Sequence, residues 1–307
     1  MSQCLVGDEV RYDGSGARSS VPYQKLAELF DFHTICPEVG IGMSIPREPI
    51  RLVGTLDDNR VVGVKDPSID KTADLEAFAA AQVDTVGQLD GYVFMHNSPS
   101  CGLFHVKVYP SGLNAPAVRQ GRGAYARALM DALPLLPVEE GGRLFDDVLC
   151  ENFVTRVYAY AHWRRAVPDM TPGGLIAFHS AYKFLLMAHS PRIYGEVGRL
   201  LSNLKHDFED KRDAYIGLLL EGLSQPATRK THANVLSHLQ GYLKKRISSA
   251  ERQELDEMIQ AYRRAELPLL APMAVLRHHF RRHPDDYVLG QSYLDPHPSW
   301  AGLRRTL

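Results

Sequence analysis

Three of the four cysteines stand in short glycine-rich segments at the ends of apolar runs. Cys4 opens CLVGDEVRYDG, Cys36 opens CPEVGIGMSIPR, and Cys101 lies in NSPSCG. Three converging thiolates suit a metal centre with one coordination position open to a substrate, whereas four-thiolate sites are usually structural or electron-transferring. Zinc fits the ligand count, but its ligands often arrive in closely spaced pairs, and the sequence has no Cys-x-x-Cys pair. The alternative interpretation is three separate loop or core cysteines.

Alternating strands and helices are expected to position these three segments. Apolar, β-rich runs predict strands over residues 3–6, 32–36, 60–64 and 91–95, with helical patterns between them. This alternation is typical of an α/β domain with a mostly parallel sheet and flanking helices, here assigned to residues 1–167. Ligands bind at the carboxyl ends of the strands in an open α/β sheet, so all three cysteines should face one crevice.

The second part of the chain has a different pattern. From Gly174 onward the apolar positions recur at helical spacing and are interrupted by X-Pro dipeptides, which predicts about six helices. We therefore expect an all-α helical bundle over residues 175–307, joined to the first domain by a linker at 168–174.

The cysteine segments together resemble the thiouracil desulfurase family. The resemblance continues through Gly-Ala-Tyr-Ala at 123–126, the segment 136–144 and the segment 151–157, and it covers about residues 2–165. It implies a 4Fe–4S cluster that is held by Cys4, Cys36 and Cys101, with one iron left open. Cys150 matches no ligand position of the family, so we expect it to be a buried structural thiol.

The resemblance also implies a reaction, which is the removal of sulfur from a thiocarbonyl. The open iron binds the exocyclic sulfur as a Lewis acid, water attacks the ring carbon, and sulfide departs without net redox change. A general acid or base is then required. Glu38 is the first candidate, and Ser100 and Ser98 are candidate donors to the base or to the polarised intermediate. Alternatively, Glu38 accepts hydrogen bonds from its own loop, and Ser98 caps a helix.

Three further residues are candidates for substrate binding. Asp13 and Arg11 are placed to position the substrate, or to brace their turn as an ion pair, and Arg47 is placed to contact phosphate or to anchor its loop. Two lysines common in the family are missing, because Ser-Gly-Ala-Arg stands at 15–18 and Asn97 precedes Ser-Pro-Ser-Cys-Gly. These departures leave the cluster ligands intact but put the details of substrate orientation in doubt.

The second part resembles a helical domain of the YbgA type. The segments 178–190, 234–245 and 291–298 carry this resemblance, which covers roughly residues 175–300. Proteins that combine these two domains are similar to desulfidases acting on 4-thiouridine, including within transfer RNA (tRNA). The resemblance therefore implies that the helical domain binds RNA.

The charge distribution is consistent with an RNA partner. Residues 181–307 contain 19 Lys+Arg and 14 Asp+Glu, a net charge of +5, whereas residues 1–180 contain 16 and 22, a net charge of −6. A basic half attracts phosphate, and a solvated bundle with salt-bridged faces is the alternative. The candidate RNA-binding residues are Lys183, Arg192, Lys244, Lys245, Arg246, Arg281 and Arg282.

Composition excludes several classes of protein. With 45% hydrophobic and 23% charged residues the chain is not intrinsically disordered, and it has neither a membrane-length apolar run nor a secretory signal pattern. We expect a cytoplasmic enzyme that converts 4-thiouridine, in tRNA, to uridine and sulfide. The alternatives are a desulfidase of free thiouracil or thionucleosides only, and a cluster-containing redox sensor that binds nucleic acid. The oligomeric state is not predicted.

Overall fold

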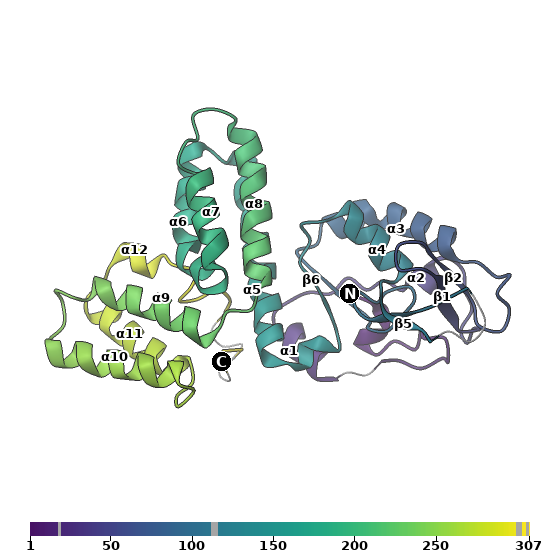
Figure 1. Cartoon of the computed structure of the whole chain (residues 1–307), viewed down its shortest axis with the longest axis horizontal. Helices are drawn as coiled ribbons and strands as arrows, with labels where there is room; N and C mark the ends of the chain where they lie inside the picture. The colour runs from purple at the N-terminus through teal and green to yellow at the C-terminus, as the bar shows by residue number, and fades with distance from the viewer. Residues whose placement is uncertain (18–19, 112–115, 299–302, 305–306) are drawn as a thin grey trace. The chain divides into compact units, whose positions relative to one another are not determined.

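A computed structural model describes residues 1–17, 20–111, 116–298, 303–304 and 307. The chain divides into two compact units, Met1–Asp146 and Asp147–Leu307 (Figure 1). Helix α5 (Asp147–Ala166), which the sequence-based boundaries place in the first domain, belongs to the second unit. Among the described residues, no helix has the length and apolar character needed to cross a bilayer.

The first unit contains two sheets. Its strands are β1 (Ile50–Gly54), β2 (Asn59–Gly63), β3 (Tyr92–Phe94), β4 (Val106–Tyr109), β5 (Val118–Gly121) and β6 (Val138–Glu140). The larger sheet has the order β2-β1-β4-β5, and β3 pairs with β6 in the smaller one. Pairs β1–β4 and β3–β6 are parallel, whereas β1–β2 and β4–β5 are antiparallel.

The α/β class is therefore confirmed, but the larger sheet is mixed rather than mostly parallel. Strands β1 and β2 are joined by a tight turn in which the Thr55 N–H donates to the Asp58 carbonyl at 2.8 Å. A connection of this length allows only an antiparallel hairpin, because parallel strands need a long crossover.

Helices cover the sheets of the first unit. They are the 3₁₀ helix η1 (Gln3–Val6), α1 (Ser20–Ala27), α2 (Pro37–Gly40), α3 (Thr72–Gly87), α4 (Ala124–Ala132) and η2 (Arg143–Phe145). Helices α3 and α4 pack side by side (Figure 1). Their buried faces include Leu75 and Ala79 from α3 and Tyr125 and Leu129 from α4.

The strand predicted over residues 3–6 is wrong, because this segment forms the 3₁₀ helix η1. Only Ser2 makes a sheet-like bridge, to Ile35. The chain then turns at Gly7, which has a φ of 105° and donates to the Cys4 carbonyl at 3.2 Å. Glycine adopts this left-handed conformation at no steric cost, so the turn ends the extended segment. The strand predicted over 32–36 is likewise reduced to the bridge at Ile35.

The second unit is all-helical, as predicted. Besides α5 and the 3₁₀ helix η3 (Val167–Asp169) it contains α6 (Pro172–His189), α7 (Pro191–Leu200), α8 (Phe208–Ser224), α9 (Arg229–Tyr242), α10 (Ser249–Arg263), α11 (Leu270–Arg282) and the short α12 (Asp286–Leu289). Side-chain caps begin several of these helices, for example Thr228 of α9 and Ser248 of α10, each in a capping box. One apolar core, including Leu186, Leu219 and Leu236, joins them.

Candidate active site

All three loop cysteines line one cavity in the first unit. Cys4 lies in η1, Cys36 is the N-cap residue of α2, and Cys101 follows β3 after a short turn. The cavity has a volume of about 410 Å³ and is called the cysteine cavity below. The cysteines are separated by 32 and 65 positions in the chain, so only the fold brings them together.

Main-chain pairing explains this convergence. The Ser2 N–H donates to the Val93 carbonyl of β3 at 2.8 Å, and the Gln3 N–H donates to the Ile35 carbonyl at 2.9 Å. Three segments that lie side by side in this way end at the same edge. Each cysteine follows one of them, so its thiol enters the same space.

The environment of the thiols opposes their ionisation. Burial raises the pKa of Cys4 to about 11, and the neighbouring Cys36 contributes to this rise. Burial also raises the pKa of Cys36 and that of Cys101, which the charges of Glu38 and Cys4 raise further, while a hydrogen bond from Ser2 opposes the rise at Cys101. A negative charge on one thiol makes the ionisation of the neighbouring thiols less favourable. Three thiolates can therefore share this cavity only beside a cationic group that offsets their charge.

The chemistry of these donors bears on the kind of centre. No group of three or more His, Cys, Asp or Glu side chains among the described residues is arranged to hold a metal ion. Cysteine thiolates are the usual protein ligands of iron–sulfur clusters, so three thiols that line one cavity fit such a group.

Glu38 stands on the wall of the cysteine cavity and is held from two sides. Its Oε2 accepts from Arg47 Nε at 2.7 Å, and its Oε1 accepts from the Ser100 hydroxyl at 2.9 Å. Arg47 also donates to the Val10 carbonyl at 2.8 Å and to the Ser44 carbonyl at 3.3 Å. The guanidinium therefore anchors its loop and fixes the carboxylate, and each of its three nitrogens donates one hydrogen bond within the protein.

The two serines of the Cys101 loop have different surroundings. Ser98 lines the cavity, and its hydroxyl accepts from the Ser100 N–H at 3.2 Å and the Cys101 N–H at 3.0 Å, which shapes the turn that presents the thiol. Ser100 is fully buried, and it reaches the cavity through its hydrogen bond to Glu38.

Arg11 and Asp13 both contact the Ser15 hydroxyl, but only Arg11 lines the cysteine cavity. Arg11 lines the cavity, and its Nη1 donates to the Ser15 hydroxyl at 3.3 Å. Asp13 is exposed and accepts from the Ser15 hydroxyl at 2.6 Å and from the Ser15 N–H at 3.0 Å, and it is not among the described lining residues. These hydrogen bonds lower the pKa of Asp13 and make it part of a local turn. Arg18, at the first departure from the family pattern, lies outside the described residues.

The sequence analysis did not single out several residues of the cavity wall. Among them is His96, whose imidazole is a side chain that can transfer protons. His96 lies two residues after the end of β3, and its Nδ1 is buried without a hydrogen-bond partner in the described part of the chain. Its position after the strand predicted at 91–95, within the crevice-facing loop, was a usable signal. Ser2 and Asn97 also line the cavity.

The fourth cysteine lies in the other unit. Cys150 is fully buried in α5, and none of the four cysteines forms a disulfide. This burial matches the expected structural thiol.

The seven cationic residues singled out in the second unit have unlike surroundings. Arg192 is ion-paired with Glu196 and Glu221 at 2.7 and 2.8 Å. Lys183 lies over the rings of Phe184 and Tyr287, with its Nζ 5.5 and 5.9 Å from the ring centroids. The exposed ones at the helix ends are Lys244, Lys245, Arg281 and Arg282.

Arg246 connects the ends of two helices. Its guanidinium donates to the carbonyls of His283 and Pro284, at 3.2 and 2.5 Å, and pairs with Asp285 at 3.3 Å. These contacts tie the end of α9 to the end of α11. The four exposed cations, which lie at those two ends, therefore gather at one end of the unit.

Comparisons with known proteins agree with this division of the chain. Residues 1–141 match the family model for 2-thiouracil desulfurase, and residues 183–298 match a family described as a protein of unknown function, DUF1722. The chain is 37% identical over 165 residues to the uncharacterized protein YbgA of Escherichia coli (strain K12), which is 53% of this chain and 95% of the relative.

Two further similarities involve smaller parts of the chain. The uncharacterized protein YbbK of Bacillus subtilis (strain 168) is 29% identical over 134 residues, 39% of this chain and 88% of that protein. Among solved structures, the 4Fe–4S-dependent thiouracil desulfidase TudS is 26% identical, with a TM-score of 0.38 over 47% of this chain and 91% of that one.

Proposed function

We propose that this chain, which belongs to the YbgA family and carries a 2-thiouracil desulfurase region in residues 1–141, is a 4Fe–4S-dependent desulfidase that converts 4-thiouridine in tRNA to uridine. The observation that carries the proposal is the cysteine cavity, in which Cys4, Cys36 and Cys101 meet within the matched region. These three cysteines hold the cluster and leave one iron open. When bound, the cluster supplies a thiophilic Lewis acid for the sulfur of the substrate.

The reaction exchanges sulfur for oxygen without a change of oxidation state. A carbon–oxygen bond forms between the ring carbon and a water molecule, the carbon–sulfur bond breaks, and the sulfur leaves as sulfide with the protons of the water. Glu38 takes a proton from the water, because its carboxylate lines the cavity and is fixed by Arg47 and Ser100. His96 lines the same cavity, so it is a second candidate for moving a proton.

The helical unit supplies the contact with tRNA. Lys244, Lys245, Arg281 and Arg282 are exposed at one end of this unit, and a group of exposed cations binds phosphates in a salt-dependent way. The 4-thiouridine base must leave its stack to reach a cavity of this kind, so local flipping of the nucleotide accompanies binding.

The cluster is tested first, by replacing Cys4, Cys36 and Cys101 with alanine one at a time in the full chain. Each variant should lose iron and the brown absorbance, whereas Cys150→Ala, which removes the cysteine of the other unit, should keep both. An active Cys36→Ala protein with full iron content contradicts the proposal.

Anaerobic incubation with three substrates tests the reaction. The wild-type protein is given 4-thiouridine-containing tRNA, free 4-thiouridine and free thiouracil, and nucleoside analysis measures the products. Conversion in tRNA supports the proposal. Conversion of the free compounds alone supports a small-molecule desulfidase, and a tight tRNA complex without conversion supports a redox sensor.

A further inference from the structure

We propose that the helical unit binds unpaired nucleobases of RNA on two stacked tyrosines, Tyr242 of α9 and Tyr287 of α12. This inference rests on the proposed function and deepens it, because it names single-stranded segments as the part of the RNA that this unit holds. The centroids of the two rings lie 5.6 Å apart, and their planes differ by 24°. Together with Lys183 of α6 they are called the tyrosine platform below.

The tyrosine platform is held by the core and is partly open to solvent. Phe184, which is only 2% exposed, meets the rings of Tyr242 and Tyr287 edge-on, each at a centroid distance of 6.3 Å. Tyr242 is nevertheless 38% exposed, and Tyr287 is half-buried. Aromatic rings that are both fixed and exposed offer a flat surface on which a further ring can stack. Every nucleobase has such a flat face, so this surface suits unpaired bases of any type.

Lys183 places a positive charge beside these rings. Its Nζ lies 5.5 Å from the centroid of Phe184 and 5.9 Å from that of Tyr287. Burial opposes the charge of Lys183, but the phenols of Tyr194, Tyr287 and Tyr242 raise its pKa above the ordinary value. In the described part of the chain Lys183 takes part in no ion pair. Its charge is therefore available to a phosphate next to a stacked base.

A second stacked pair extends the aromatic surface around Lys183. His179, one turn earlier on α6, stacks on Tyr194 of α7 with a centroid distance of 6.5 Å and an angle of 21° between the planes. Both side chains are half-buried. Burial, followed by the charge of Lys183, lowers the pKa of His179 to about 4, so this ring is neutral at pH 7. Several aromatic rings around one cation fit successive bases of a single strand.

The tyrosine platform continues into the exposed cations at the same end of the helical unit. Lys244 and Lys245 follow Tyr242 by two and three positions. Arg246 donates to two carbonyls of the segment that precedes α12, which holds Tyr287 near the end of α9. Stacking rings beside cations that contact the backbone are typical of proteins that bind single strands. The bases of a duplex are already stacked on one another, so a duplex would use the cations alone.

Binding of RNA that contains no 4-thiouridine tests the tyrosine platform apart from catalysis. Fluorescence anisotropy of the full chain compares a short labelled RNA strand with the same strand annealed to its complement. The double variant Tyr242→Leu/Tyr287→Leu should bind the single strand about tenfold or more weakly, because stacking of a base on an aromatic ring is worth about this much. It should bind the duplex as the wild-type protein does.

Two control variants and a milder variant make this test specific. Tyr242→Phe/Tyr287→Phe keeps both rings and should keep the affinity for the single strand. Phe145→Leu removes an exposed ring of the first unit and should also keep it. Melting temperatures report on folding. If the double leucine variant is destabilised, Tyr242→Leu alone, at the more exposed ring, should still weaken single-strand binding about fivefold or more.

The salt dependence of binding separates stacking from phosphate contacts. The leucine variants should lower the affinity without changing the slope of log affinity against log salt, whereas replacing Lys244 and Lys245 with glutamine should reduce that slope. Equal weakening of single-strand and duplex binding overturns the inference, as does an equal loss in the phenylalanine variant or a wild-type protein that binds no single-stranded RNA. Failure of the proposed function would instead appear as single-strand binding by the platform with no conversion of any thiolated substrate.

Discussion

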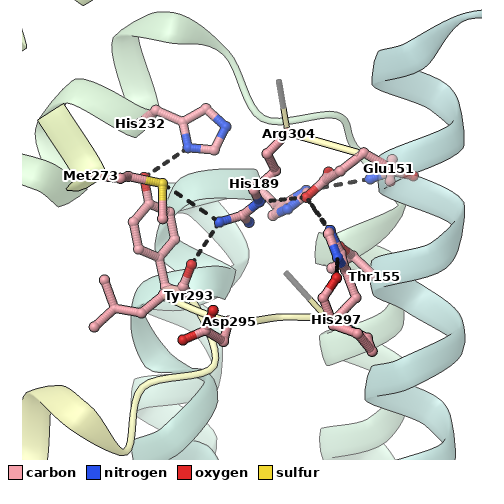
Figure 2. A network of polar contacts seen from close by, with 12 residues as sticks. Glu151, Thr155, His189, His232, Met273, Tyr293, Asp295, His297 and Arg304 are labelled. Carbon is pink, nitrogen blue, oxygen red and sulfur yellow. Dashed lines mark hydrogen bonds and ion pairs between the residues drawn. The ribbon is translucent and has the colours of Figure 1, made fainter. Parts of the chain in front are cut away.

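The guanidinium of Arg304 donates to the carboxylate of Glu151 at 2.7 Å inside the helical unit, where both side chains are only 6% exposed (Figure 2). Arg304 also donates to the Tyr293 carbonyl at 2.7 Å, and Thr155 donates to Glu151 at 3.3 Å. His297 lies 3.4 Å from the same carboxylate oxygen. This network fastens the C-terminal segment to α5, so it bears on the stability of the whole unit.

Removing the negative charge of this pair should strongly destabilise the protein. Glu151→Gln leaves the buried Arg304 without a counter-charge, and breaking a buried pair costs about 3–5 kcal/mol in the free energy of unfolding. Urea denaturation measures this loss, and Glu257→Gln on the exposed face of α10 should change stability by no more than about 0.5 kcal/mol. The double variant Glu151→Gln/Arg304→Met should be more stable than the single one; a less stable double variant contradicts this account.

Buried histidines next to this network should make the helical unit sensitive to acid. Burial, followed by the charges of Arg304 and His189, lowers the pKa of His232 to about 3, and burial lowers the pKa of His189. His232 meets Tyr293 in a hydrogen bond of 2.9 Å, and Glu151 and Arg229 also act on it.

Below pH 6.5 the unfolded chain therefore binds protons that the native protein does not. The free energy of unfolding should fall by about 1.4 kcal/mol per pH unit for each such histidine, and for His232 this loss continues down to about pH 3. Urea denaturation between pH 7.5 and 4.5 measures the slope. His232→Gln should reduce it, whereas replacing the exposed His278 should not. An unchanged slope in His232→Gln contradicts the prediction.

Gly123 controls the position of the loop that carries Cys101. A Cβ at this position would lie 2.4 Å from the Ser100 carbonyl carbon, and the Gly123 N–H donates to the Gly102 carbonyl at 2.8 Å. Gly123→Ala should therefore displace the loop and lower both iron content and melting temperature. Gly87→Ala in the same unit meets only Leu133 at 3.6 Å and should be tolerated. Full iron content in Gly123→Ala would contradict this prediction, because it would show that the loop accommodates the added methyl group without losing the cluster.

Sequence patterns predicted the parts of the fold that depend on local periodicity. The helical unit followed from apolar spacing and prolines, and β3 followed from the run at 91–95. The segment 3–6 has the composition of a strand but forms η1. The chain turns at Gly7, and the pairing with the neighbouring segment is limited to the bridge between Ser2 and Ile35. Hydrophobic composition alone does not contain that information.

The meeting of the three cysteines in one cavity was predictable from the strands expected before them, although the strands expected at 3–6 and 32–36 do not form. Contacts between residues far apart in the chain were not predictable. The partners of Arg47 are 9 and 37 residues away, and those of Arg246 are 37 to 39 residues away, so no spacing rule reveals them. The pairing of β1 with β4 is equally non-local, because it brings Leu52 beside a residue more than 50 positions later in the chain.

Glu38 should be required for turnover but not for the cluster. Glu38→Gln keeps the shape of the side chain and removes its ability to take a proton, so kcat should fall about 10²–10⁴-fold while iron content stays near that of wild type. Ser100→Ala should give a smaller loss, because Arg47 still holds the carboxylate at 2.7 Å. Glu28→Gln, an exposed carboxylate, is the control. Loss of iron in Glu38→Gln would assign it to cluster support instead.

The four exposed cations at one end of the helical unit should govern the salt dependence of tRNA processing. Replacing Lys244, Lys245, Arg281 and Arg282 with glutamine should raise KM for thiolated tRNA, and the slope of log affinity against log salt should fall by up to about 0.7–0.9 per lost phosphate contact. Arg246 is left intact, because its bonds to His283 and Pro284 hold the helix ends together. Lys230→Gln, at the opposite end of α9, should keep the wild-type slope. An equal loss of activity on tRNA and on free 4-thiouridine would mean that these cations act on folding or on the cavity, since free nucleoside makes no contact with an extended phosphate backbone.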